Sequence, residues 1–324
     1  MPLSPTSTPP YMRRINVRRD LLPVADLIQL CFGDQMDADG QEYLRQMHQT
    51  ARDGSYFRWM PGAGEMLSYP LDGYVWEEDQ KIVANLTLLP FSWRNKWIYM
   101  VVNVAVHPAY RRKGIARQLT QQAIQHARQH HVSAVWLQVR DDNESAIALY
   151  LSLGFQPRCK RSTWQNITPY PQNVFIPPEV EVFAGTPKDW KKQESWLNNT
   201  YPEEVAWNFA FHTGRFKPSF LNRLTRWLNA DEQRHWTALL DGKLIGTAIW
   251  EPGRWSADTI WLGAETDYQD YAIRALLPTV RHALGNKRPC YVNYPAGQAT
   301  HAFESAGFAL QNTLIWMSIE LTAH

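Results

Sequence analysis

The chain has 324 residues, more than a usual single domain, so we expect two domains. Its formal net charge of +2 at pH 7 gives no electrostatic case for binding nucleic acid or an anionic membrane, and 44% apolar residues suffice for real cores. Three distant cysteines, with no C-x-x-C pair, indicate free thiols in a reducing compartment and argue against zinc. No signal-peptide pattern or membrane-length apolar run is found, so we expect a soluble, cytoplasmic protein.

Apolar spacing divides the first part of the chain into helices followed by strands. Four acidic residues, Asp34, Asp37, Asp39 and Glu42, cluster around the start of the second helix. They suit either attraction of a cationic amine or capping of a solvated helix start, and the sequence leaves both open. The expected elements are a short strand at 14–18, helices at 21–32 and 38–52, a loop at 56–69, and a hairpin of strands 73–76 and 82–89.

The apolar run at 99–106 is short and rich in valine, which predicts a buried strand, and the whole strand is expected to span 96–106. The helix that follows is marked by Ile115, Leu119 and Ala123, which repeat at helical spacing with polar residues between them. We therefore expect a strand, a turn with the sequence RRKG at 111–114, and a helix.

This turn is suited to bind an anion. Gly114 lies at the first turn of the helix, where backbone N–H groups have no intrahelical partner and the helix dipole is positive. Glycine leaves room for a phosphate, and Arg111, Arg112 and Lys113 add positive charge. Neither the Walker P-loop nor the dinucleotide fingerprint is present. The residues predict a pyrophosphate cradle, the alternative being a solvated basic turn.

A second strand and helix follow. The apolar run at 132–139 predicts the strand, and Asn143 is a residue type that caps helices well. Tyr150 lies two helical turns after Asn143 on the same face, and the helix is expected to end at Gly154.

Together these segments resemble the Gcn5-related N-acetyltransferase (GNAT) family. The family motif Q/R-x-x-G-x-G/A is matched by RRKGIA at 111–116, after the strand residues 103–106 and a His-Pro pair at 107–108. The family segment N-x-x-A-x-x-L-Y-x-x-x-G-F is matched at 143–155. The resemblance is specific for about the first half of the chain.

The resemblance implies a fold, a co-substrate and a reaction. The fold is an α/β (α+β mixed sheet) architecture, the GNAT acyl-CoA N-acyltransferase fold, with helices on both faces of the sheet. The reaction is transfer of an acetyl group from acetyl-CoA (coenzyme A) to an amine, without a metal. The implied cofactor-binding residues are Val104, Ala105, Val106, Arg111, Arg112, Lys113, Gly114, Ile115, Ala116, Arg117 and Asn143.

The resemblance also assigns Tyr150, whose family counterpart lies beside the thioester sulfur. We expect its phenol to protonate the departing thiolate as general acid, the alternative being a packing role. Val104 and Val106 are expected to pair with the pantetheine arm, and one N–H of this strand to meet the acetyl oxygen, which requires the two central strands to splay apart. Asn143 remains open between a cofactor contact and pure helix capping.

The sequence assigns no general base. Asn103 stands where an acidic residue would help, and His107, although histidine suits such a role, lies beside the cofactor turn. Glu77, Glu78 and His131 are no better founded.

The second half repeats the first at low fidelity. Predicted domain boundaries are 1–165 for the acetyltransferase domain, 166–178 for a proline-containing linker, and 179–324 for a second domain. The sequence FESAGF at 303–308 echoes YLSLGF at 150–155. The expected elements are a hairpin of strands 236–240 and 243–250, a strand at 259–263, a helix at 271–284 and a strand at 291–294.

The second copy departs from the family at each functional position. Phe303 replaces the tyrosine, the segment 267–274 has no glycine, and the counterpart of Asn143 falls at Ala296. We interpret the chain as two tandem GNAT domains, of which the degenerate second kept the fold and lost the cofactor site. The alternative is two unrelated domains.

Three functional hypotheses follow from this sequence. The leading one is an N-acetyltransferase with a small-molecule or peptide amine as acceptor, and neither nucleic acid nor membrane as partner. The competing one, favoured by the missing general base, is a non-catalytic acyl-CoA-binding or regulatory module. A GNAT-like transferase that uses charged tRNA is disfavoured by the near-neutral charge and the intact pyrophosphate motif. A homodimer is compatible with the sequence, which leaves the oligomeric state open.

Overall fold

The chain forms two compact units, the first made of residues 1–159 and 315–324 and the second of residues 160–314. Within the described part, no helix is both long and apolar enough to cross a membrane, and no three His, Cys, Asp or Glu side chains gather as a metal site would require. The computed structural model describes residues 11–36, 38–53, 72–167, 169–171, 174–185, 189–209, 211–218, 232–253, 257–285 and 288–321.

The first unit is built on a mixed sheet. Its first four strands pair antiparallel with one another, and the fifth runs parallel to the fourth. The C-terminal part of β12 (Phe308–Glu320), from Ile315 onward, follows next to β5, and the Leu321 N–H donates to the Ser133 carbonyl at 2.8 Å. In order along the sheet the strands are β1 (Met12–Arg14), β2 (Asp72–Glu78), β3 (Lys81–Trp93), β4 (Lys96–Val106) and β5 (Ala134–Arg140).

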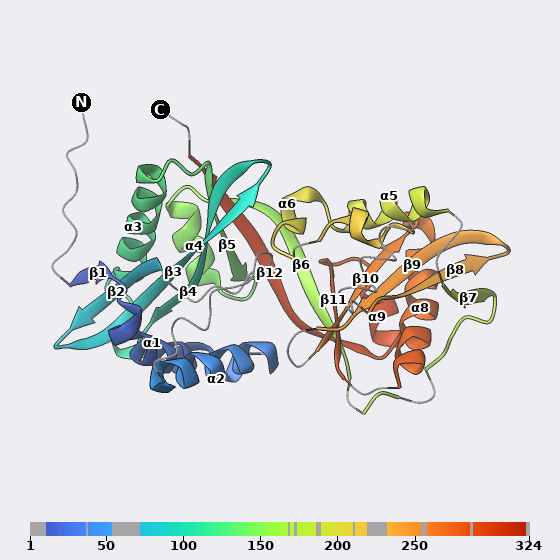
Figure 1. Cartoon of the computed structure of the whole chain (residues 1–324), viewed down its shortest axis with the longest axis horizontal. Helices are drawn as coiled ribbons and strands as arrows, with labels where there is room; N and C mark the ends of the chain where they lie inside the picture. Colours follow the sequence, from blue (N-terminus) through green and yellow to red (C-terminus); the bar gives the residue numbers. More distant parts are fainter. Residues whose placement is uncertain are drawn as a thin grey trace. The chain divides into compact units, whose positions relative to one another are not determined.

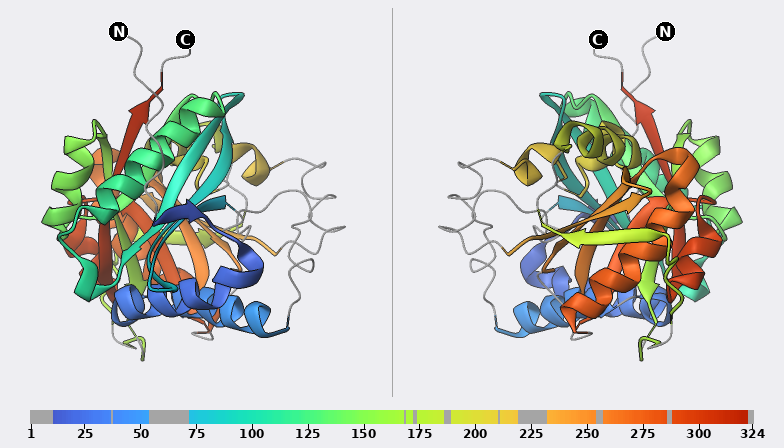
Figure 2. Two further views of the ribbon diagram at one scale, coloured as in Figure 1. Left: turned by 90° about the vertical axis from the view of Figure 1, so that its left-hand side faces the viewer. Right: turned by 90° about the vertical axis from the view of Figure 1, so that its right-hand side faces the viewer.

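Helices cover both faces of this sheet because apolar residues alternate along the strands. On β2, Val75 packs with α1 (Val17–Phe32) and α2 (Ala38–Asp53), whereas its neighbours Tyr74 and Trp76 pack with α3 (Ile115–Gln129). Figures 1 and 2 show α3 and the α1–α2 pair on opposite sides of the strands. The short helix α4 (Glu144–Ser152) follows β5.

The second unit repeats this plan. Along its sheet β6 is followed by β11, β10, β9, β8 and β7. Ile260 and Leu262 of β10 pack with α8, and Trp261 between them packs with α5 on the other face. The elements are β6 (Gln156–Asn166), β7 (Val180–Ala184), α5 (Trp190–Thr200), α6 (Glu203–Ala206), β8 (Arg234–Leu240), β9 (Lys243–Glu251), β10 (Asp258–Ala264), α8 (Gln269–Leu284), β11 (Cys290–Pro295) and α9 (Thr300–Ser305).

Most predicted elements are confirmed, including the helix at 38–52 and the strand at 96–106. The strand predicted at 14–18 is wrong, because β1 ends at Arg14 and α1 begins at Val17. The physical reason is the cap: the Asn16 side chain accepts a hydrogen bond from the Arg18 N–H and starts the helix early. The loop predicted at 56–69 lies outside the described residues.

The two compact units divide at other places than the predicted domain boundaries. The division falls between Cys159 and Lys160, within β6, and Ile315 onward returns to the first unit. Met317 of β12 is fully buried in the core of the first unit. A strand supplied by the far end of the chain has no local sequence signature, so spacing and composition did not indicate it.

Candidate functional site

Helix α3 begins where the sequence predicts, and its first turn is open. Gly114 is its N-cap, with a φ of 78° and a ψ of 5°, in the left-handed region that glycine adopts without strain. No described side chain caps this end, and a Cβ added at Gly114 would meet nothing within 4 Å. The first-turn N–H groups, which lack intrahelical partners, are therefore accessible to an anion.

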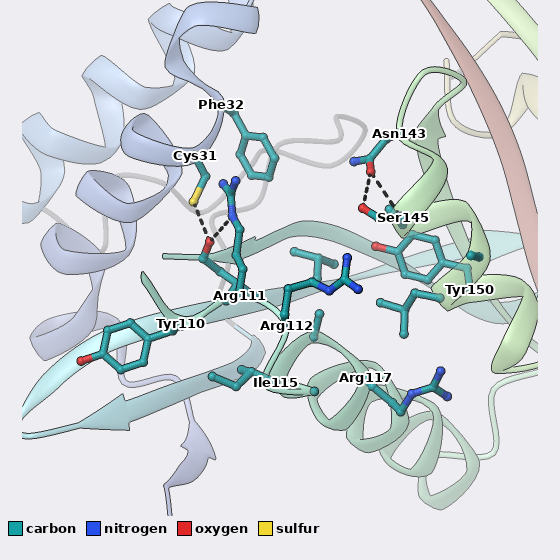
Figure 3. Close-up of a pocket in the computed structure, with 17 residues that line it drawn as sticks. Cys31, Phe32, Tyr110, Arg111, Arg112, Ile115, Arg117, Asn143, Ser145 and Tyr150 are labelled. Carbon is teal, nitrogen blue, oxygen red and sulfur yellow. Dashed lines mark hydrogen bonds between the residues drawn. The ribbon is translucent and has the colours of Figure 1, made fainter. Parts of the chain in front are cut away.

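A cavity of about 660 Å³ lies beside this helix start. Figure 3 shows its walls, which come from the end of α1, the end of β4, the start of α3, and α4. Among the described lining residues there are three arginines, but no carboxylate and no imidazole. The lining residues are Cys31, Phe32, Val104, Val106, Tyr110, Arg111, Arg112, Gly114, Ile115, Ala116, Arg117, Asn143, Ser145, Ala146, Ala148, Leu149 and Tyr150.

Strand β4 opens toward a gap because it separates from β5. The parallel pairing ends at Val101 and Leu137, although β4 continues to Val106 and β5 to Arg140. The splay of the two central strands that the resemblance implies is therefore present.

The backbone of β4 presents alternate residues to this gap. The His107 N–H donates to the Val83 carbonyl on β3 at 2.8 Å. Since hydrogen-bonding direction alternates along a strand, Val104 and Val106 direct their backbone groups away from β3, and both line the cavity. Ala105 pairs with β3 instead and is buried.

The Val106 carbonyl already has two side-chain partners. Arg111 Nε donates to it at 3.2 Å, and Cys31 Sγ at 3.4 Å (Figure 3). Burial raises the pKa of the Cys31 thiol, and the neighbouring Arg111 works against that rise. The thiol is therefore protonated at neutral pH, and Arg111 lies over the end of β4.

Tyr150 combines a buried ring with a hydroxyl that points into the cavity (Figure 3). Its ring meets that of Phe155 edge to face, with centroids 5.8 Å apart. Burial raises the pKa of Tyr150 to about 12, so the phenol is protonated at neutral pH. Its hydroxyl makes no hydrogen bond to any residue that the structure describes, which leaves the O–H available to a ligand.

Asn143 is the N-cap of α4. Its Oδ1 accepts from the Ala146 N–H at 3.2 Å and from the Ser145 hydroxyl at 3.1 Å. The capping role left open by the sequence is therefore present, while its Nδ2 bonds to no described residue and lies at the cavity wall.

Comparison with known proteins gives the family of this unit. Residues 33–155 match the model of the Acetyltransferase (GNAT) family. The first unit belongs to the GNAT family. The ribosomal protein bS18-alanine N-acetyltransferase of Escherichia coli K12 is 38% identical over 74 residues, 23% of this chain and 50% of that relative. The chain thus spans about half the length of the curated relative it matches.

Similarity to solved GNAT structures extends over both units. The GCN5-related N-acetyltransferase from Sphaerobacter thermophilus matches with a TM-score of 0.61 and 17% identity, covering 97% of each chain. A tandem GNAT protein from the clavulanic acid biosynthesis pathway matches with a TM-score of 0.52 and 18% identity, covering 97% of this chain and 99% of that one. At these identities the likeness concerns the fold, and the chain has the fold of a tandem GNAT protein.

Within the GNAT unit, all but two of the predicted cofactor-binding residues line the one cavity. The exceptions are Ala105, buried against β3, and Lys113, whose ammonium lies 4.6 Å from the centre of the Tyr110 ring. Arg117 lines the cavity but donates to Ser152 Oγ at 2.7 Å, so it also ties α3 to α4.

Sequence reasoning missed several cavity residues. Cys31 and Phe32 come from the end of α1, far away in the sequence; Tyr110 precedes one recognised motif, and Ser145 occupies an unspecified position within the other. The periodicity of α1 predicts a helix but not which of its ends faces a cavity. Flanking positions offer a weak signal only once the motifs are in register.

None of the residues weighed as general base lines the cavity. Glu77 pairs with arginines of β1 and α1, and the His107 ring accepts the Ala109 N–H at 3.2 Å. The acidic cluster does not line the cavity either: Glu42 is engaged by neighbours on α2, Asp34 is exposed, and Asp37 lies outside the described residues.

The second unit has a matching gap at β10. Its pairing with β11 ends at Thr259. The backbone N–H of Glu265, the residue after β10, donates to the Ile245 carbonyl, as the N–H of His107, the residue after β4, donates to the Val83 carbonyl. Leu262 lies three residues before Glu265, as Val104 lies three residues before His107, so Leu262 is the counterpart of Val104. The Leu262 N–H donates to the Tyr201 hydroxyl at 3.2 Å, so a side chain of the same unit occupies the backbone donor.

Other positions of the second gap also differ from the first. Phe303 is fully buried and stacks on Trp164 with centroids 4.8 Å apart, so it is a core residue. The sequence places the counterpart of Asn143 at Ala296, but the N-cap of α9 is Ala299, which offers no side-chain cap. This correction arises because the segment before α9 does not keep the spacing of the first copy.

Proposed function

We propose that the protein is an N-acetyltransferase that transfers an acetyl group from acetyl-CoA to an amine. The observation that carries the proposal is the cavity, which joins the open start of α3 to the Tyr150 hydroxyl. An acyl carrier that bears a diphosphate needs an anion-binding end and a reactive end, and both lie in this one cavity.

The start of α3 fits a diphosphate. Open space at Gly114 allows phosphate oxygens to approach the first-turn N–H groups. Arg111 and Arg112 at the cavity wall add positive charge, and the first turn contains no acidic residue. These features favour a bound anion over a merely solvated turn.

The end of β4 is the proposed seat of the pantetheine arm. Val104 and Val106 direct backbone groups to the gap, and the Val106 carbonyl becomes available once Arg111 and Cys31 release it. Acetyl-CoA supplies an acetyl group activated as a thioester. The Val104 N–H is the proposed donor to the acyl oxygen, where negative charge develops during transfer.

Tyr150 is the proposed general acid. As the amine nitrogen bonds to the acyl carbon, the C–S bond breaks and the sulfur takes the phenol proton. The proton that the amine loses passes to solvent, from which the phenolate is protonated again. A phenol of pKa about 12 is a weak acid toward a thiolate whose conjugate acid has a pKa near ~8.5, so donation of a hydrogen bond precedes full proton transfer.

The acceptor amine must be neutral to attack. The described cavity walls contain no carboxylate or imidazole to take its proton, and their arginines disfavour a cationic amine. These features favour an amine of low pKa, such as a peptide α-amino group at about 7.7–8.0, over a lysine side chain at about 10.4. The name of the E. coli relative, an alanine N-acetyltransferase for a ribosomal protein, points to the same class.

Thiol release from acetyl-CoA tests this proposal directly. The acceptors are a peptide with a free N-terminal alanine, the same peptide N-acetylated but carrying one lysine, and a small amine of low pKa. We expect acceptor-dependent thiol release with the first and third and much less with the second. Acetyl-CoA binding without thiol release for any acceptor would contradict the proposal.

One observation favours a second function, a non-catalytic acyl-CoA-binding or regulatory module. It is that the described cavity residues include no carboxylate or imidazole that could act as general base. This function predicts that replacing Tyr150 by phenylalanine changes nothing in the assay, whereas the enzyme hypothesis predicts a lower kcat.

A further inference from the structure

Strand β4 carries one extra residue where it leaves β5. On β3, Asn85 and Thr87 are two positions apart, but their partners Ala105 and Val102 on β4 are three positions apart. This is a β-bulge, and Asn103 within it has a φ of 53°, in the left-handed region that asparagine adopts more readily than most residues other than glycine. A bulge re-aims the backbone that follows it, here the Val104 N–H.

Asn85 on β3 holds this bulge. Its Nδ2 donates to the Asn103 carbonyl at 2.9 Å, and its side chain is fully buried. Its second hydrogen bond within the described chain, to Thr87 Oγ1, is long at 3.5 Å. The short bond to the Asn103 carbonyl is therefore the main interaction of this amide.

Burying this amide is costly. Asn85 Oδ1 has almost no exposed surface and accepts no hydrogen bond from any described residue. Leaving a buried acceptor unpaired costs about 1–3 kcal/mol, so packing alone favours an apolar side chain here. The bond to Asn103 gives the asparagine a role that an apolar side chain does not fill.

The second unit supplies an internal comparison. Strands β9 and β10 keep a constant register from Thr259 and Glu251 to Ala264 and Gly246, so β10 has no bulge. Thr247, opposite Gly263, takes the place of Asn85, opposite Ala105.

The hydroxyl of Thr247 turns away from β10. It donates to the Trp236 carbonyl of β8 at 3.1 Å. The β9–β10 pair, which lacks the asparagine, thus also lacks the bulge. In that pair the Leu262 N–H, which faces away from β9, is already bonded to the Tyr201 hydroxyl.

We propose that Asn85 is a positioning residue for acetyl transfer. By holding the Asn103 carbonyl it maintains the bulge and directs the Val104 N–H into the gap, where the proposed function places the acyl oxygen. The inference rests on that proposed function. Removing one oxyanion donor lowers kcat about 10²–10³-fold, so misdirecting the Val104 N–H should lower it at least about tenfold.

The test replaces Asn85 by leucine, which is close in size and cannot donate. We expect kcat to fall at least about tenfold while the KM for acetyl-CoA changes less than about threefold, because the diphosphate end is untouched. In ¹⁵N-valine-labelled protein, the Val104 amide resonance should shift. The control Thr87→Val removes the second, longer hydrogen-bond partner of Asn85 but leaves the Asn85 bond to the Asn103 carbonyl in place, so it should leave kcat and the Val104 resonance unchanged.

A rescue experiment separates positioning from packing. Glycine adopts a positive φ without strain, so Asn103→Gly should make the bulge less dependent on Asn85. The double variant Asn85→Leu/Asn103→Gly should regain most of the kcat of Asn103→Gly alone. If Asn85→Leu does not fold, the double variant should fold, and Asn85→Thr, the residue of the second unit, takes the place of the single variant.

The outcomes are decisive in both directions. A Val104 resonance that stays in place in Asn85→Leu, a kcat within about twofold of wild type, or a double variant no better than the single one overturns the role of Asn85. Wild-type protein without any acetyl transfer refutes the proposed function instead, and the Val104 resonance then still reports on the bulge.

Discussion

The gap beside β4 and the gap beside β10 both form where a strand separates from its parallel neighbour, but different residues line them. In both units the fourth strand of the fold pairs briefly with its parallel neighbour and then separates. The first gap opens into a cavity of about 660 Å³ whose far wall holds Tyr150. In the second, the Tyr201 hydroxyl accepts the N–H of Leu262, the residue that matches Val104.

The helix starts that follow these strands differ in charge and shape. Helix α3 begins at a left-handed glycine, with arginines beside it and no acid in its first turn. Helix α8 begins after Tyr268, with Asp267 just before it and Asp270 in its first turn. Carboxylates at a helix N-terminus interact with the positive end of the helix dipole and so compete with a phosphate for that position.

The comparison shows which residues preserve a fold and which preserve a site. Apolar alternation on the strands and one apolar face on α3 or α8 are kept in both units. The differences concern one glycine, one tyrosine, one asparagine on β3 and the charges of one turn. The second unit therefore keeps the strand order of the fold although these residues differ.

The largest expected effect is on acetyl-CoA binding, from Gly114→Leu. The side chain would fill the space that the phosphates need, so we expect binding to weaken at least about hundredfold, a loss of ~2.7 kcal/mol or more. The matched control is Gly285→Leu at the end of α8, where φ is 66° and an added Cβ also meets nothing within 4 Å. Both variants should lose a similar amount of stability, measured as Tm. Equal affinities of the two variants for acetyl-CoA would contradict the difference between the two helix ends.

The next effect is on turnover, from Tyr150→Phe. We expect kcat to fall about 10²-fold with little change in the KM for acetyl-CoA, since the phenol acts on the leaving group. Tyr201→Phe removes the same atom from a buried tyrosine whose pKa is also raised to about 12 by burial. It should leave kcat unchanged, and a similar loss in both variants would point to stability rather than chemistry.

A smaller effect is expected in the pH dependence of kcat. Burial raises the pKa of Tyr150 to about 12, and the acid is active when protonated, so its active form persists as pH rises. We expect kcat to rise as the acceptor amine loses its proton and then to stay level up to about pH 10.5. A decline near pH 9 that Tyr150→Phe abolishes would show that the phenol ionises far earlier than its burial implies.

The smallest effect concerns the cap of α4. Asn143→Ala should cost about 1 kcal/mol of stability, because Oδ1 accepts the Ala146 N–H, and Asn143→Asp should keep that cap. In α9 of the second unit the N-cap is Ala299, so that helix forms without a side-chain cap. A raised KM for acetyl-CoA in both Asn143→Asp and the uncharged Asn143→Ser would assign its Nδ2 to the cofactor, whereas an unchanged KM restricts Asn143 to capping.

Much of the site lies in segments that local patterns predict. The strand at 96–106, the helix after Gly114 and the capped helix that bears Tyr150 were predictable, because periodicity and capping act over a few residues. Their order along the chain then fixes which ends meet at the cavity.

What the sequence did not reveal depends on contacts between distant segments. The bulge at Asn103 arises from pairing with β3, and Cys31 reaches the cavity through the packing of α1. The split of β12 places Met317 in the first unit, far from its neighbours in sequence. No spacing rule reports such contacts, since each side chain looks ordinary in its own segment.

The central claim is that the first gap holds acetyl-CoA and the second does not. Calorimetric titration of the full chain with acetyl-CoA measures this as a stoichiometry. The account predicts one molecule bound per chain, with binding lost in Gly114→Leu and retained in Gly285→Leu. Two molecules per chain, or one whose binding survives Gly114→Leu, would contradict it.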